Sequence, residues 1–281
     1  MAIAEKLPSE KRVIFLILLS DNPIYIRDMN AQKETWVKLS NENEKIFWVK
    51  GANVKEVTIE GSLLLIPIQE GYDLILEKTR IAMEWCIANM EFDILVRTNT
   101  STYWNLPRLR EKTRTIESEN EVFWGYLETC NSYWADTKFN FISGAGMIFT
   151  KPAAVKIVKI QPGNYKGIPE DVAFSKFALD IGITMKPISR SNVHHLGIYL
   201  SSVYARLKGT DNLLQAAKRM YLIDEIEKSK NPLFKFMRQF TLISDEFRRD
   251  SLKPKNFLPK IKNVGYIALK RFKYKLWKSD L

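Results

Sequence analysis

The stretch Phe92-Asp-Ile-Leu-Val-Arg97-Thr-Asn99-Thr-Ser101 decides the fold class of this 281-residue chain. Its apolar run at 94–96 has the length and β-branching of a strand that is buried on both faces. The run stops in small polar side chains, and ligands of open α/β sheets bind just beyond the carboxyl ends of such strands. The stretch therefore predicts an α/β fold with a ligand near residues 97–101, although the same residues also suit a plain strand end and turn.

Strands and helices are expected to alternate on both sides of this stretch. The expected strands cover residues 13–19, 46–49, 63–67, 123–126 and 139–149. The expected helices cover residues 26–39, 74–90 and 172–179. Alternation of this kind predicts βαβ units in the first half of the chain, and the two later strands are expected to be antiparallel.

Two later segments carry further candidate site residues. In Ile142-Ser-Gly144-Ala-Gly146-Met-Ile-Phe149, we predict a glycine turn that lets the backbone pass close to a ligand, and a β-bulge explains the glycines equally well. Pro169-Glu170-Asp171-Val172 predicts an acidic pair at the start of a helix. Acids in a first helical turn also stabilise the helix dipole by about 0.3–1 kcal/mol, so a structural role is the alternative to a catalytic one.

The order of these segments resembles that of the beta-1,3-galactosyltransferase and Fringe family. The matching segments are Arg27 to Thr35-Trp36, Tyr72 to Lys78-Thr79, Trp85-Cys86, the strand from Phe92, Gly144-Ala-Gly146 and Glu170-Asp171-Val172. The similarity covers roughly residues 11–200. It implies a GT-A (Rossmann-like) glycosyltransferase domain, which we place at residues 1–205, followed by a C-terminal extension.

The resemblance implies an inverting glycosyltransferase. Such an enzyme moves a sugar from a nucleotide-sugar donor, such as UDP-Gal, UDP-GlcNAc or UDP-Xyl, to a hydroxyl of a lipid-linked, polysaccharide or glycoprotein acceptor. By this resemblance Asp171 is the general base and Glu170 its neighbour. The candidate donor-binding residues are Arg27, Lys78, Arg97, Asn99, Ser101, Gly144, Ala145 and Gly146. A non-catalytic relative that binds a sugar or nucleotide is the alternative.

One departure from the family concerns the metal. Where the family carries Asp-Asp-Asp to hold a divalent cation, this chain has Asn99-Thr100-Ser101. Mn²⁺ and Mg²⁺ favour carboxylate oxygens, so two alternatives stay open: a metal held by Asn99, Ser101 and His195, or metal-independent action.

Without a metal, cationic side chains would have to stabilise the diphosphate leaving group. Arg97 is the expected residue, with Lys78 and Arg80 behind it, because a guanidinium matches phosphate oxygens bidentately. The alternative role of Arg97 is a salt bridge to a neighbouring acid.

The excess positive charge lies in the C-terminal part of the chain. Residues 206–281 contain 19 Lys and Arg against 8 Asp and Glu. The difference, +11, equals the net charge of the whole chain. We predict a basic, mainly helical extension there, which packs on the catalytic domain and contacts an anionic membrane peripherally. Packing on the catalytic domain without membrane contact is one alternative. Binding of nucleic acid is a disfavoured one, because residues 1–205 are neutral.

Cysteine content and the N-terminal residues bear on localisation. Cys86 and Cys130 are the two cysteines, which favours a reducing compartment, although a single disulfide stays open. Residues 1–12 are too polar for a signal peptide, and the apolar run at 13–19 is too short to span a bilayer. We therefore expect a cytoplasmic protein.

Overall fold

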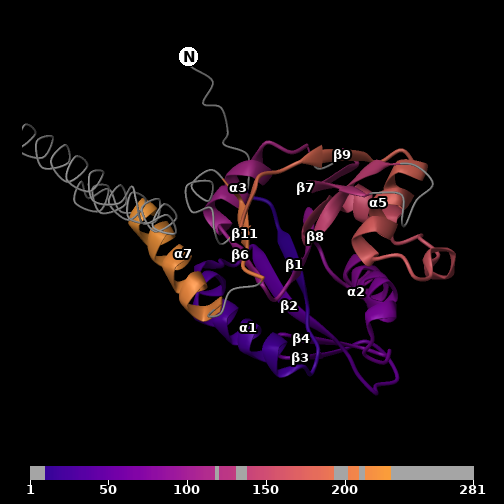
Figure 1. Ribbon diagram of the computed structural model, residues 1–281, viewed down its shortest axis with the longest axis horizontal. Helices are drawn as coiled ribbons and strands as arrows, with labels where there is room; N and C mark the ends of the chain where they lie inside the picture. Colours follow the sequence, from indigo (N-terminus) through magenta and orange to yellow (C-terminus); the bar gives the residue numbers. More distant parts are fainter. Residues whose placement is uncertain (1–9, 118–119, 131–137, 193–201, 209–212, 229–281) are drawn as a thin grey trace, which may run out of the picture. The chain divides into compact units, whose positions relative to one another are not determined.

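The computed structural model describes residues 10–117, 120–130, 138–192, 202–208 and 213–228 (Figure 1). The strands are β1 (Val13–Leu18), β2 (Glu44–Gly51), β3 (Thr58–Glu60), β4 (Leu63–Ile66), β5 (Ile94–Asn99), β6 (Thr102–Trp104), β7 (Val122–Cys130), β8 (Phe139–Thr150), β9 (Thr184–Pro187), β10 (Arg190–Asn192) and β11 (Tyr204–Arg206). The α-helices are α1 (Pro23–Glu34), α2 (Ile75–Asn89), α3 (Leu106–Arg114), α4 (Lys151–Ile157), α5 (Glu170–Asp180) and α7 (Leu213–Lys228).

The main sheet has eight strands in the order β3-β4-β2-β1-β5-β8-β7-β9. Four neighbouring pairs are parallel, namely β2–β4, β1–β2, β1–β5 and β7–β9. The strand β8 runs antiparallel to both β5 and β7, as the sequence predicted for this part. A second sheet has the order β10-β11-β6. The α/β fold class is therefore confirmed.

Side chains of β1 alternate between the two faces of the main sheet and help to build two apolar cores. Phe15 and Ile17 belong to one cluster, together with Trp36, whereas Ile14 and Leu16 belong to the other. Residues i and i+2 of a strand share a face, which produces this division. Helices α1 and α3 cover the first face, and α2 and α5 cover the second (Figure 1).

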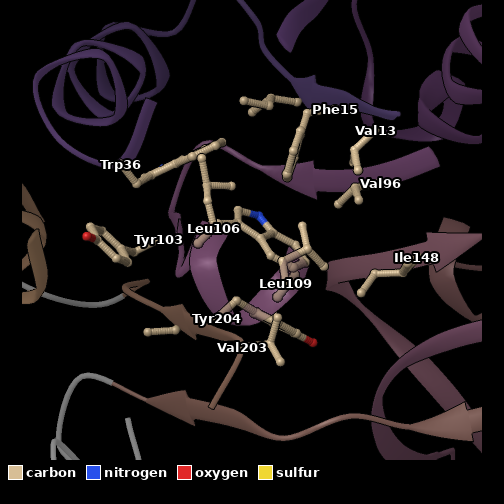
Figure 2. Packing of buried hydrophobic residues seen from close by; sticks show 14 of the residues in the cluster. Val13, Phe15, Trp36, Val96, Tyr103, Leu106, Leu109, Ile148, Val203 and Tyr204 are labelled. Carbon is tan, nitrogen blue, oxygen red and sulfur yellow. The ribbon is translucent and has the colours of Figure 1, made fainter. Parts of the chain in front are cut away.

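The first core is rich in aromatic side chains. Figure 2 shows Phe15, Trp36 and Tyr204 among the side chains of this core. The ring centroids of Phe15 and Trp36 are 5.4 Å apart. Trp104 and Tyr204 join β6 to β11 with a centroid distance of 4.7 Å. Aromatic pairs of this kind contribute about 0.5–1.5 kcal/mol beyond their buried area. Phe15 of β1 and Trp104 of β6 have ring centroids 5.7 Å apart, so ring packing also fixes the second sheet to the main sheet.

The helix expected at residues 26–39 begins earlier and is divided. Asn22 caps α1 by accepting a hydrogen bond from the Ile24 N–H at 2.9 Å, and Pro23 suits the first helical position. At Thr35 the backbone leaves the helix, and its hydroxyl donates to the Ala31 carbonyl at 2.6 Å. A separate 3₁₀ turn follows at Trp36–Leu39.

Contacts divide the chain into two units, residues 1–224 and 225–281. Within the first unit, the buried Asp224 of α7 accepts hydrogen bonds from Tyr103 Oη at 2.8 Å and Asn105 Nδ2 at 2.7 Å. These bonds tie α7, up to Asp224, to the first unit, and the domain boundary at residue 205 stays a prediction. The chain beyond residue 228 lies outside the described residues, so the helical basic extension stays a prediction there.

Cys86 and Cys130 are both buried and are not disulfide-bonded. Burial raises the pKa of the Cys86 thiol to about 12, which keeps it protonated at neutral pH.

None of the helices in the described ranges combines the length and apolar character needed to cross a membrane.

Candidate active site

The strands β4, β2, β1 and β5 are parallel, so their carboxyl ends lie along the same side of the main sheet. Along the chain they are the third, second, first and fourth parallel strands, so the strand order reverses beside β1. Open α/β sheets bind ligands outside the carboxyl ends of the strands at such a reversal. Leu18 and Asn99 are register partners at the ends of β1 and β5. A ligand is therefore expected beside Asn99.

A buried ion pair lies at this end of β5. Arg97 Nε donates to Glu170 Oε1 at 2.9 Å, and Arg97 Nη2 contacts Glu170 Oε2. Arg97 Nη1 donates to Asn99 Oδ1 at 2.9 Å and to the Gly144 carbonyl. The two charged side chains are only 4% and 6% exposed. All three guanidinium nitrogens are thus bonded within the protein, which is the alternative role that the sequence left open for Arg97.

Glu170 joins this ion pair to helix α2. The Thr79 hydroxyl donates to Glu170 Oε1. Burial raises the pKa of Glu170, while the charge of Arg97 and the Thr79 hydrogen bond act in the opposite direction. Through Glu170 and Arg97, the network connects α2, β5, β8 and the first turn of α5, which begins at Glu170 as predicted. It fixes the position of the next residue, Asp171.

Asp171 is partly exposed and its carboxylate is held in a defined orientation. Its Oδ2 accepts a hydrogen bond from the Gly144 N–H at 2.9 Å, and its Oδ1 accepts one from the Val172 N–H at 3.1 Å. Each carboxylate oxygen can accept a further hydrogen bond. Asp171 thus combines fixed geometry with the acceptor capacity that a general base needs.

Gly144, Ala145 and Gly146 lie within β8, so the predicted glycine turn is wrong and the β-bulge alternative holds. Gly125 pairs with Met147 and Leu127 with Ile142, a register shift that leaves extra residues of β8 in the bulge. We call residues 143–146 the β8 bulge. A Cβ on Gly144 would lie 3.0 Å from Arg97 Nη1 and 3.2 Å from Asp171 Oδ2. Close packing, rather than a turn, explains this glycine.

Replacement of Gly146 by alanine is expected to destabilise the fold by about 1–3 kcal/mol. The added Cβ would lie 2.7 Å from Tyr204 Cζ and 3.0 Å from Trp104 Cζ2, and these buried rings have little room to move. Urea unfolding would measure the loss. Gly163→Ala is the matched control, because its Cβ would meet nothing within 4 Å. Equal stability of the two variants would contradict the packing account of the bulge.

Asn99, Thr100 and Ser101 form the end of β5 and the turn into β6. Asn99 uses its side-chain oxygen for Arg97, and the Ser101 carbonyl accepts a bond from the Leu207 N–H at 2.7 Å. Thr100 Oγ1 is buried without a hydrogen-bond partner among the described residues. One amide and two hydroxyls do not match the carboxylate-rich set that Mn²⁺ or Mg²⁺ prefers.

In the described ranges no three His, Cys, Asp or Glu side chains come together as a metal site. His195 lies outside the described residues, so its predicted part in a metal site stays a prediction.

Lys78 and Arg80, the other cations expected near a diphosphate, have acidic partners. Lys78 is buried, and its Nζ donates to Glu70 Oε2 at 2.9 Å and to the Leu19 carbonyl at 3.0 Å. Arg80 is paired with Glu77 at 2.7 Å and also with Glu84. Lys78 thus ties the start of α2 to the end of β1, and its charge is balanced by Glu70.

Arg27 lies on α1, and its side chain is 54% exposed. Its guanidinium bonds the neighbouring Asp28 at 3.1 Å, and burial raises the pKa of Asp28 against the opposing effect of Arg27. Arg27 lines an open groove of about 530 Å³. The other lining residues are Asp21, Pro23, Ile26, Asn30, Ala31, Glu34 and Leu214. Among the described residues, no hydrogen bond or ion pair joins Arg27 to Arg97 or Asp171, so the structure does not bring this predicted donor-binding residue together with them.

Sequence reasoning missed a second charged cluster beside the β8 bulge. Arg190 Nη1 donates to Glu128 Oε1 at 2.7 Å and to Ser143 Oγ at 3.0 Å. The Arg190 guanidinium also lies 3.9 Å from the centroid of the Tyr126 ring. Arg206 of β11 approaches the same Glu128 oxygen at 3.9 Å. No local motif marks these residues, because β7 is far from β10 and β11 along the chain.

Comparisons with known proteins give fold-level similarity only. No protein-family model matches the chain, and no curated protein does. A solved glycosyltransferase involved in the glycosylation of the major capsid of PBCV-1 is 13% identical with a TM-score of 0.42, covering 74% of this chain and 98% of that one. The apo-form glycosyltransferase GlyE of Streptococcus pneumoniae TIGR4 is 8% identical with a TM-score of 0.44, covering 76% of this chain and 61% of that one. At such values a shared activity does not follow.

Proposed function

We propose that this chain is an inverting glycosyltransferase of the GT-A type that uses a nucleotide-sugar donor. The observation that carries the proposal is the partly exposed Asp171 carboxylate, oriented by the Gly144 N–H beside the carboxyl end of β5. This position adjoins the reversal of strand order where α/β sheets bind ligands. The order of the sequence motifs supports the same activity.

In the proposed reaction, the oxygen of an acceptor hydroxyl attacks C1 of the donor sugar. The new C–O bond forms on one face of C1 while the bond to the diphosphate oxygen breaks on the other, which inverts the configuration. Asp171 takes the proton of the hydroxyl, and the diphosphate leaves with the electron pair. Arg97 and Glu170 act as positioning residues, because they hold the first turn of α5 against β5 and β8.

The finer assignments rest on the sequence resemblance. The proposed donor is a UDP-sugar such as UDP-Gal, UDP-GlcNAc or UDP-Xyl, and the proposed acceptor is a lipid-linked, polysaccharide or glycoprotein glycan. The basic C-terminal extension is proposed to contact an anionic membrane peripherally. The neutral triplet at residues 99–101 favours one competing proposal, a relative that binds sugar or nucleotide without turnover.

Isothermal titration calorimetry with UDP, GDP, CMP and UDP-sugars tests the donor class. We expect saturable binding of UDP and of at least one UDP-sugar, in the presence of either Mn²⁺ or a chelator. Absence of binding to every nucleotide would contradict the proposal. Binding of a UDP-sugar that is never turned over would instead favour the non-catalytic alternative.

A further inference from the structure

Arg206 lies beside the neutral triplet at residues 99–101, where the resembling family carries its acidic residues, and Arg190 lies beside the β8 bulge. We propose that they form the subsite for the diphosphate of the donor and replace a metal ion there. This inference rests on the proposed function and names the groups that would stabilise its leaving group. Three observations support it: the position of the two arginines, the excess of their positive charge over the negative charge of Glu128, and their connection to Asp171 through the β8 bulge.

The position of Arg206 follows from the pairing of β11 with β6. Arg206 is the register partner of Thr102, and the next residue, Leu207, donates its N–H to the Ser101 carbonyl at 2.7 Å. Directly opposite residues of an antiparallel pair project from the same face. Thr102 Oγ1 donates to the Ala145 carbonyl at 2.8 Å, so this face is turned toward the β8 bulge. Arg206 therefore lies next to both the triplet and the bulge.

The cluster holds more positive than negative charge. Arg190 and Arg206 share Glu128, with distances of 2.7 and 3.9 Å to the same carboxylate oxygen. These two cations and one carboxylate leave one positive charge in excess. The Arg190 side chain is only 7% exposed, and its Nε is buried without a hydrogen-bond partner among the described residues. An anion at this place would supply the missing partner and balance the charge.

The cations that the sequence suggested for this task are already neutralised. Arg97 is paired with Glu170, and Lys78 is paired with Glu70. The side chain of Arg206 is 32% exposed, and its ion pair at 3.9 Å is too long for a hydrogen bond. Its guanidinium donors thus remain available to phosphate oxygens, which a guanidinium binds in a bidentate manner.

The β8 bulge connects this anion subsite to the proposed base. Ser143 Oγ accepts from Arg190, and the N–H of the next residue, Gly144, donates to Asp171. The base and the cations therefore approach neighbouring residues of one strand. As the bond between C1 and the diphosphate oxygen breaks, negative charge grows on that oxygen, and fixed cations there stabilise the transition state.

Calorimetric titration of the full chain with inorganic pyrophosphate, in the presence of a chelator, tests the subsite. The wild-type protein should bind saturably, and Arg206→Gln should bind about 10-fold more weakly or worse, because a hydrogen bond to a charged group is lost. Arg206→Lys should be intermediate, since it keeps the charge but not the fork. Lys159→Gln, which removes an exposed cation after α4, should bind like the wild type.

Two results would overturn the subsite: pyrophosphate affinity of Arg206→Gln equal to that of the wild type, or binding that requires added Mn²⁺. Thermal unfolding of each variant shows that a loss of binding does not reflect misfolding, and Arg206→Lys provides a second test. The outcome is separate from that of the proposed function. Weaker pyrophosphate binding without turnover of any nucleotide sugar would support the subsite and contradict the activity. Turnover that is unchanged in Arg206→Gln would support the activity and contradict the subsite.

Discussion

Asp171→Asn is expected to lower the rate of sugar transfer by about 10²- to 10⁴-fold, the range that general-base catalysis contributes. The amide keeps an oxygen that can accept the Gly144 N–H bond, which is 2.9 Å long in the structure. It cannot take a proton from the acceptor hydroxyl. The donor affinity should therefore stay within a few-fold of the wild-type value while the rate falls.

Steady-state rates and calorimetric donor affinities of the same preparations would separate these effects. Asp180→Asn is the matched control, because Asp180 is an exposed acid at the other end of α5. An unchanged rate in Asp171→Asn would reject Asp171 as the base. A rate that falls equally in the control would point to a general effect on the helix.

Glu170→Leu is expected to destabilise the protein by about 3–5 kcal/mol, because it leaves the Arg97 guanidinium buried without its carboxylate. The Thr79 hydroxyl would lose its acceptor as well. Urea unfolding measures the change. Replacing both members of the pair, as in Arg97→Met with Glu170→Leu, should cost much less than the single change, since a buried pair can often be replaced by apolar residues.

Lys156→Ala is the control for this series. Lys156 and Glu121 are 2.6 Å apart, and their side chains are partly solvent-exposed, at 43% and 36%. Ion pairs at the protein surface contribute only about 0–1 kcal/mol. If the double variant is stable yet slow in transfer with normal donor affinity, the pair acts by positioning Asp171. A single variant as stable as Lys156→Ala would contradict the account of the network.

Local patterns were sufficient to predict the main elements of the fold. The apolar run before Arg97 became β5, and the acidic pair after Pro169 opens α5, because burial and helix-start preferences act over short stretches. The turn expected at Gly144 could not be corrected from sequence. The bulge depends on the register of β7, in which Leu127 pairs with Ile142. That register is set by tertiary packing.

The site was predictable only in part for the same reason. The sequence pointed to Asp171 and Arg97 as candidate site residues, but it could not show that Arg97 meets an acid 73 residues away. The sequence of a strand end that contains a cationic residue is the same whether that residue faces a ligand or a buried carboxylate. Arg190 and Arg206 carry no motif, and only the sheet β10-β11-β6 brings them to the β8 bulge.

The most direct test of the central claim is the release of UDP from UDP-Gal, UDP-GlcNAc, UDP-glucose and UDP-Xyl by the wild-type protein, with water as the default acceptor. Each donor would be assayed with Mn²⁺ and with a chelator. The account predicts release from at least one donor, and it predicts that this release survives the chelator because arginines replace the metal. Absence of release from every donor, in a protein that also binds no nucleotide, would contradict it.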